Sequence, residues 1–208
     1  MITRRARSET AKAARRDEII AATESQLVMH GVQAVSMQDI ATACNLTKPA
    51  LYNYFSTREA IFLALYQKLV RHWLTGFNRS LVTADHPLPR NAFNRLFVES
   101  FAAQPLLCHL TNHLTATVAP KLSAAALLRL KSDTSDQLAG LAALLVHYGY
   151  TDDNGSQDLS WAYYTIVTGA AQIADQPDGA AADDRLSMPA PERASFVANC
   201  LATLAWLR

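Results

Sequence analysis

A short segment of the sequence combines groups that bind phosphate oxygens. Thr47 and Lys48 stand at the start of a predicted helix, and Tyr52 and Tyr54 follow within its length. Proteins contact nucleic-acid backbones with cations, phenolic hydroxyls and the main-chain amides of helix N-termini. The chemistry that these residues favour is therefore the non-covalent recognition of a polyanion.

A second group has the spacing of a metal site. His109 and His113 lie four residues apart on one face of a predicted helix, next to Cys108. Position 110 is a leucine, so the zinc-protease motif is absent, and no third ligand is identifiable. We predict that both histidines belong to a core or a ligand pocket, with no metal and no cofactor. A helical metal-dependent enzyme using these three residues is the alternative.

The composition favours an all-α fold in a reducing compartment. Of the 208 residues, 50% are hydrophobic, and glycine and proline number only 7 and 8, a balance that favours helix over sheet. No apolar run reaches the roughly 18 residues that span a membrane, and the charged N-terminus lacks the apolar stretch of a signal peptide. Three widely separated cysteines do not form a disulfide framework, so we expect a cytoplasmic protein.

Helical periodicity and cap residues predict helices along the whole chain, with no strand and no repeat. The predicted helices cover about 9–30 or 16–30, 36–44, 47–55, 56–80, 91–103, 105–118, 123–148, 158–174 and 192–207. The composition of 85–89, 151–156 and 175–191 predicts loops. Ser56 and Glu59 have the spacing of a capping box and are expected to begin the fourth helix.

Residues 36–55 have the layout of a helix-turn-helix, in which the second helix enters the major groove of DNA. Ser36 begins a Ser-x-x-acid capping box, and Asn45 tolerates the left-handed conformation that a tight turn needs. Leu51 and Phe55, four residues apart, can anchor the second helix to a core. Two ordinary core helices are the alternative, but they would not require a lysine and a proline beside two tyrosines.

These segments resemble the signature of the TetR (tetracycline-repressor) family of transcription regulators. The resemblance covers about residues 16–65, and several spacings agree at once. It rests on Ser36-Met37-Gln38-Asp39-Ile40-Ala41, on Leu46-Thr47-Lys48-Pro49-Ala50-Leu51-Tyr52-Asn53-Tyr54-Phe55-Ser56-Thr57-Arg58-Glu59-Ala60-Ile61, and on Arg16-Asp17-Glu18-Ile19-Ile20 leading to Gly31. Three positions depart from the common pattern: Asn45 replaces a turn glycine, Arg58 a lysine and Gln26 an apolar residue.

The resemblance implies an N-terminal three-helix DNA-binding domain at 1–60 and a larger ligand-sensing and dimerising helical bundle at 61–208. Residues that would face base edges are Gln38, Lys48, Pro49 and Ala50, and those that would face phosphates are Thr47, Tyr52, Tyr54 and Arg58. Beside such a motif, the basic N-terminal residues become a plausible phosphate or minor-groove arm, although alone they would predict a solvated tail. These residues are Arg4, Arg5, Arg7, Lys12, Arg15 and Arg16.

The larger part of the chain carries apolar and aromatic residues that can line a pocket between helices. The candidates are Trp73, Phe77, Phe97, Phe101, Leu107, Leu114, Trp161 and Tyr164, together with His109 and His113. Few charges accompany them, so the expected ligand is apolar or aromatic. For any single residue of this set, ordinary core packing is the alternative.

The last two predicted helices are apolar on broad faces, which favours a two-fold four-helix interface between subunits. The residues concerned are Tyr163, Ile166, Val167, Ala170, Ala171 and Ile173 on one helix, and Phe196, Val197, Cys200, Leu201, Leu204 and Leu207 on the other. A monomeric core is the alternative. We expect a homodimeric, ligand-responsive repressor that binds a palindromic operator and is not an enzyme. An activator of the same fold is the alternative.

Overall fold

The computed structural model describes residues 4–82, 88–118, 124–174 and 190–207, and all the regular structure in these ranges is helical. The helices are α1 (Arg4–His30), α2 (Met37–Ala43), α3 (Lys48–Tyr52), α4 (Arg58–Val82), α5 (Arg90–Ala102), α6 (Pro105–His113), the π-helical turn η1 (Leu114–Val118), α7 (Ala124–His147), α8 (Asp153–Ala174) and α9 (Ala190–Leu204). The all-α prediction is confirmed. No helix of this described part is long and apolar enough to cross a membrane.

The chain divides into two compact units, Met1–Tyr66 and Gln67–Arg208. The division falls inside α4, a few residues beyond the boundary at 60 that the sequence suggested. In the first unit, the buried side of α1, with Ile19 and Leu27, shares a core with Ile40 of α2 and Leu51 of α3. Every one of these side chains is fully buried.

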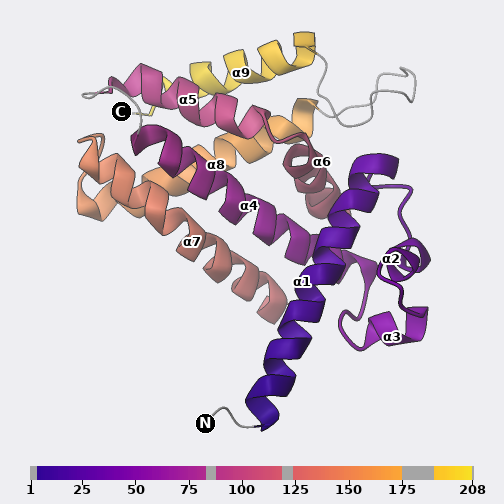
Figure 1. The fold of residues 1–208 in the computed structure, drawn as a ribbon. Coiled ribbons are helices and arrows are strands. Elements are labelled where there is room, and N and C mark those ends of the chain that lie inside the picture. The colour runs from indigo at the N-terminus through magenta and orange to yellow at the C-terminus, as the bar shows by residue number, and fades with distance from the viewer. Residues whose placement is uncertain (1–3, 83–87, 119–123, 175–189, 208) are drawn as a thin grey trace. The chain divides into compact units, whose positions relative to one another are not determined.

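The second unit is built around aromatic packing. Figure 1 shows α5 and α9 side by side, and α8 contacts α6, α7 and α9. Between α4 and α5, the Trp73 ring lies 5.0 Å from the ring centroid of Phe101, and Phe77 lies 5.2 Å from Phe97. These tilted and edge-to-face contacts fix the helices beyond what area burial alone would do.

Three helix boundaries differ most from the sequence prediction. α1 begins at Arg4, earlier than either predicted start, so the basic segment is helical from that point. α8 begins at Asp153 because the Asp152 carboxylate accepts a hydrogen bond from the Gly155 amide (2.9 Å), which turns a predicted loop into a capped first turn. The expected helix 105–118 changes to π-helix after His113. The His113 carbonyl accepts a hydrogen bond from the Thr117 hydroxyl (2.6 Å), and this side-chain bond competes with the main-chain hydrogen bonds of the helix. The predicted loop 175–191 lies almost entirely outside the described residues.

The start of α4 also corrects the sequence prediction. Its first turn is capped by Thr57, whose hydroxyl accepts from the Ala60 amide (3.0 Å), and not by Ser56. Glu59 makes no box with Ser56 and instead accepts from Arg58 (3.2 Å). The neighbouring hydroxyl residues shift the cap by one position, which the Ser-x-x-acid spacing alone could not show.

Replacement of the capping hydroxyl should destabilise the protein. We expect Thr57→Ala to lower the free energy of unfolding by about 1 kcal/mol, since an amide of the first turn of α4 loses its partner. Ser56→Ala is the matched control and should change it by less than about 0.5 kcal/mol. Urea unfolding of both variants measures the difference, and an equal loss in the two would contradict the assignment of the cap.

Candidate functional sites

The helix-turn-helix exposes most of its predicted contact residues. Gln38 on α2 is exposed, as are Thr47, Lys48 and Pro49 at the start of α3. Tyr52, at the end of α3, keeps 47% of its surface exposed. Ala50 is half-buried, and Leu51, on the opposite side, is fully buried as predicted. The first turn of α3 is therefore open to a ligand along its whole length.

Local sequence signals fix the two short helices and the turn. The Ser36 hydroxyl and the Asp39 carboxylate complete the predicted capping box of α2, and Thr47 accepts from the Ala50 amide (3.3 Å) as the cap of α3. Asn45 adopts a φ of 53° in the turn, the left-handed conformation expected of it. The hydrogen bond from Ser36 is the main cause that lowers the pKa of Asp39, so this carboxylate is ionised at neutral pH.

Two arginines of α1 tie the ends of the short helices to the first helix. Arg15 donates to the carbonyl of Cys44 (3.0 Å), the residue that ends α2. Arg16 donates to the carbonyl of Tyr54, just after α3, and its guanidinium lies 3.9 Å from the centroid of the Phe55 ring. Carbonyls at helix C-termini lack helical partners, and a cation there is favourable. These two residues therefore position the motif from within the domain.

The sequence predicts Arg15 and Arg16 to be part of a DNA-binding arm, whereas the structure places both at carbonyl groups of the domain itself. A signal for Arg16 was present, because it continues the face of α1 that carries Ile20, Thr23 and Leu27 at spacings of three and four. A basic residue in line with a buried face can reach over the edge of a core and bond a carbonyl there.

Arg58 holds the other side of the motif. It donates to the carbonyl of Val35 (3.1 Å), which precedes the cap of α2, and to the carboxylate of Glu59 (3.2 Å). Its side chain is only 28% exposed, and Tyr54 is likewise half-buried. The resemblance to the TetR family predicts that Arg58 and Tyr54 contact DNA phosphates. The structure gives Arg58 a role inside the domain, and a phosphate contact for either stays a prediction.

The aromatic residues proposed for a ligand pocket pack closely in the second unit. Trp73, Phe77, Phe97 and Phe101 are each at most 2% exposed, and the Trp73 indole donates to the Ser100 hydroxyl (2.9 Å). Leu107, Leu114 and Tyr164 are also buried, whereas Trp161 is half-buried and its ring lies 5.8 Å from that of Tyr164. This packing matches the core alternative, and a ligand among these residues stays a prediction.

The two histidines of α6 occupy different environments. His113 is 6% exposed and His109 is half-buried. Cys108 is buried, and its thiol lies 3.8 Å from the Phe101 carbonyl as a weak donor. Within the described ranges, no cluster of three or more His, Cys, Asp or Glu side chains could hold a metal ion.

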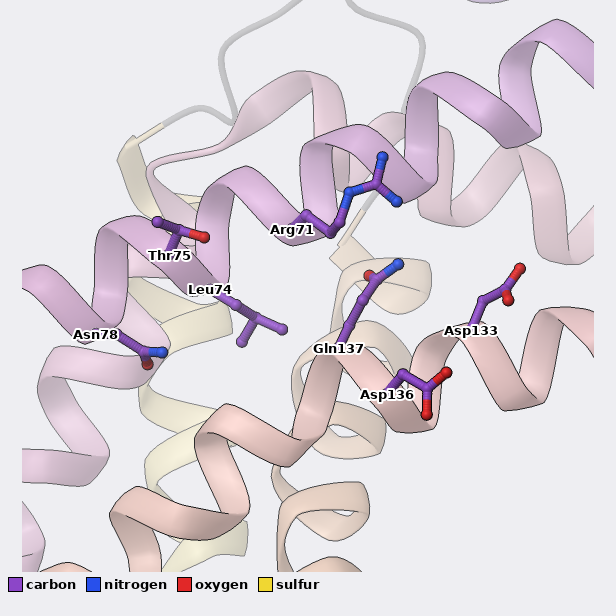
Figure 2. Close-up of a pocket in the computed structure, with 7 residues that line it drawn as sticks. All are labelled: Arg71, Leu74, Thr75, Asn78, Asp133, Asp136 and Gln137. Carbon is purple, nitrogen blue, oxygen red and sulfur yellow. The ribbon is translucent and has the colours of Figure 1, made fainter. Parts of the chain in front are cut away.

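A polar groove runs between α4 and α7, a position that the sequence did not indicate. Figure 2 shows the residues that line it, which are Arg71, Leu74, Thr75 and Asn78 on α4 and Asp133, Asp136 and Gln137 on α7. The groove has a volume of about 460 Å³. Gln67 donates to Asp133 (2.9 Å) beside it. A Cβ at Gly140 would lie 3.1 Å from the side-chain nitrogen of Asn78, a tight contact with the flexible end of that side chain.

The faces expected at a dimer interface divide into two sets. Tyr163, Val167, Ala171, Phe196, Cys200 and Leu204 are buried within the subunit itself. Ile166, Ala170, Val197, Leu201 and Leu207 remain half-exposed, and the side chain of Ile173 lies outside the described residues. Asn112 donates to the Ala171 carbonyl (3.1 Å), which ties α6 to the inner side of α8. Part of the predicted interface is thus monomer core, and the remainder forms an outer apolar surface.

Comparison with known proteins assigns both parts of the chain. Residues 19–65 match the model of the bacterial regulatory proteins of the tetR family, and residues 67–205 match the model of the tetracyclin repressor-like C-terminal domain. The first match spans the helix-turn-helix with its flanking helices. The second spans nearly all of the remaining helices.

The curated relatives are transcription regulators. The chain is 32% identical over 69 residues to the HTH-type transcriptional activator FasR of Mycolicibacterium smegmatis, over 33% of this chain and 32% of FasR. It is 30% identical over 92 residues to the HTH-type transcriptional regulator EthR of the same organism, over 42% of this chain and 41% of EthR. The matched part thus spans less than half the length of either relative.

Solved structures share the fold over almost the whole chain. A TetR-family regulator from Pectobacterium atrosepticum superposes with a TM-score of 0.65 at 19% identity, over 99% of this chain and 95% of that one. FadR of Thermus thermophilus, a TetR-family repressor in complex with lauroyl-CoA, superposes with a TM-score of 0.61 at 17% identity, over 91% and 93%. Since the family models match both units, the chain belongs to the TetR family of transcription regulators, which are DNA-binding proteins and not enzymes.

Proposed function

We propose that this protein is a cytoplasmic repressor that binds a palindromic operator as a homodimer and is released by a small molecule. The observation that carries the proposal is the open first turn of α3, where Thr47, Lys48 and Pro49 are exposed while Leu51 and Phe55 are buried beneath them. The N-terminus of such a helix offers amides and a cation to DNA in the major groove.

Within this proposal the contact residues have separate tasks. Gln38 and Lys48, both exposed, read base edges together with Pro49 and Ala50. Tyr52 places a half-exposed hydroxyl where it can bond a phosphate, and Thr47 contributes from the cap of α3. Arg16 and Arg58 act first by holding the motif in shape.

Dimerisation is supported by the outer surfaces of α8 and α9. From Ala194 to Leu207 the sequence contains no charged residue, and most of the side chains that α9 exposes there are small. Trp206 is 83% exposed. Burial of such an uncharged face against a second copy of the subunit is favourable.

The release step follows from the geometry of a two-fold operator. Two reading units bind half-sites about one helical turn apart only if their separation matches that spacing. A ligand that binds better to the subunit arrangement with another separation shifts the protein off the DNA. The lauroyl-CoA bound to FadR supports a small-molecule ligand, and the activator FasR supports activation as the second candidate function.

Operator binding should depend steeply on salt, because basic residues displace counterions from phosphates. We expect the logarithm of the association constant to fall linearly with the logarithm of salt concentration, with a slope of about −0.9 for each phosphate neutralised. Genome-wide mapping of bound DNA supplies the operator, and fluorescence anisotropy measures its affinity at rising salt. A scrambled duplex is the control, and equal affinity for both duplexes would refute specific DNA recognition.

Substitutions should separate positioning contacts from base reading. Tyr52→Phe removes one hydrogen bond to a charged acceptor and should weaken binding to all sequences alike, by about 0.5–3 kcal/mol. Gln38→Ala and Lys48→Ala should relax preference at particular base pairs, by about 1–3 kcal/mol each. Binding to a panel of single-base operator variants distinguishes the two results. A uniform loss in all three variants would show that the roles are misassigned.

Substitution of the outer face of α8 should dissociate the dimer. Ala170 is half-exposed in the subunit, and Ala170→Arg would place two unpaired cations in a desolvated two-fold contact, which costs several kcal/mol. We expect a helical monomer with weak operator affinity, measured by sedimentation and circular dichroism. Ala139→Arg, on an exposed position of α7, is the matched control and should stay dimeric. A dimeric Ala170→Arg variant would place the interface elsewhere.

A further inference from the structure

A second cavity, of about 340 Å³, lies between the start of α5 and the end of α9. Its α5 wall consists of Arg90, Asn91, Asn94 and Arg95. Among the described residues that line it, none is an aspartate or glutamate, so the charged side chains of this part of the lining are both positive. Arg90 is the first residue of α5, and the positive end of that helix dipole adds to the same potential.

Two donors of the Arg90 guanidinium lack a partner. Its Nε and Nη2 atoms are buried and have no hydrogen-bond partner among the residues that the structure describes. The side chain as a whole is half-buried, the Tyr163 hydroxyl interacts with it, and the centroid of the Tyr150 ring lies 5.8 Å from the guanidinium carbon. Buried donors without a partner are costly, so this guanidinium is a candidate for pairing with an anion from outside the chain.

The neighbouring tyrosine does not supply the missing negative charge. Tyr163 is fully buried, and its hydroxyl donates to the Asn94 side-chain oxygen. Burial raises the pKa of Tyr163 and outweighs the opposing effect of Arg90, so this side chain stays a neutral phenol at neutral pH. Asn94, engaged by the hydroxyl, is also neutral.

The opposite wall is apolar. Leu201 and Leu204 of α9 and Leu207 just beyond it face the α5 residues across the cavity. Arg95 stands at the solvent side, 63% exposed and 3.5 Å from Glu99, so screening by water and by this partner weakens its pull on a ligand. The cavity thus offers one half-buried cation, one exposed cation and a hydrocarbon surface.

We propose that this cavity binds a small amphipathic anion, whose carboxylate or phosphate group pairs with Arg90 while a short apolar body packs on the half-exposed Leu201 and Leu207. An anionic ligand differs from the apolar or aromatic ligand that the sequence predicts. That prediction rests on aromatic residues with few charges near them, which give no reason to expect an anion. The binding of the anion to the cavity is independent of the proposed function. Control of DNA binding by the anion rests on that proposed function.

Titration calorimetry without DNA tests the binding itself. Octanoate and octyl phosphate are the probes, and 1-octanol and octylammonium are their neutral and cationic matches. We expect one site per subunit for an anionic probe and at least about tenfold weaker binding of the alcohol, the effect of a lost charge-assisted hydrogen bond. The two anionic head groups show whether the site prefers carboxylate or phosphate. Equal binding of octanoate, octyl phosphate and octanol, or binding of none, would overturn the proposal.

Two variants assign the binding to Arg90. Arg90→Gln should weaken the better anionic probe by about 10- to 100-fold. Arg129→Gln removes one positive charge from an exposed position of α7 that does not line the cavity, and should leave affinity unchanged. Asp85 lies outside the described residues. If Asp85→Asn raises affinity for the anion, this carboxylate already pairs with Arg90 and the proposal fails.

Thermal unfolding distinguishes a binding residue from a structural one. Arg90→Met keeps most of the side-chain volume and removes the unpaired charge, so the ligand-free variant should melt at or above the temperature of the natural protein. It should also lose the stabilisation that the anionic probe gives the natural protein. A variant that melts several degrees lower would assign Arg90 to the fold instead. Anion binding without release of the operator would leave the cavity established and contradict only the proposed regulation.

Discussion

Because α3 is so short, the geometry of the DNA-binding unit depends on contacts that other parts of the unit make with it. A helix of five residues has barely one turn of hydrogen bonds, and its nucleation is unfavourable in water. Its shape therefore depends on groups outside it: the buried Leu51 and Phe55 beneath, and the hydrogen bond from Arg16 to the Tyr54 carbonyl at its end. Arg15 and Arg58 do the same for both ends of α2. A surface held in this way loses little conformational entropy when it binds, which favours affinity.

This constraint divides the basic residues of the first unit by their tasks. A guanidinium is suited to bonding a carbonyl while it stacks on an aromatic ring, and Arg16 does both with Tyr54 and Phe55. Lysine offers a compact and strongly hydrated charge instead, and Lys48 is exposed at the start of α3. The residues that shape the motif and those that can meet the phosphates are therefore chemically distinct, although the sequence shows them as one group of cations.

The predictions from the sequence succeed where the cause is local. The capping box at Ser36, the left-handed turn at Asn45 and the cap at Thr47 each involve atoms within a few residues, and the structure contains all three. They fail where neighbouring residues compete, as at Thr57 and Ser56, or where the partner is distant in the chain, as for Arg16 and Tyr54. Aromatic composition likewise could not distinguish a pocket from a core, because contacts such as that between the Trp73 and Phe97 rings, whose centroids lie 5.2 Å apart, form only when α4 and α5 pack together.

In the second unit, buried polar atoms that lack hydrogen-bond partners bear on regulation more than the apolar side chains do. Where aromatic side chains already contact one another, a ligand gains few new contacts unless they move apart. Buried donors of Arg90 that lack a partner are different, because a binding anion removes a penalty that the ligand-free subunit carries. A ligand shifts an equilibrium only by its difference in affinity for the two states. If the α5 and α9 walls move apart in one state, Arg90 regains water there and the anion gains less from pairing with it. The anion then favours the closed arrangement of α5 on α9, and α9 belongs to the surface proposed to join the two subunits.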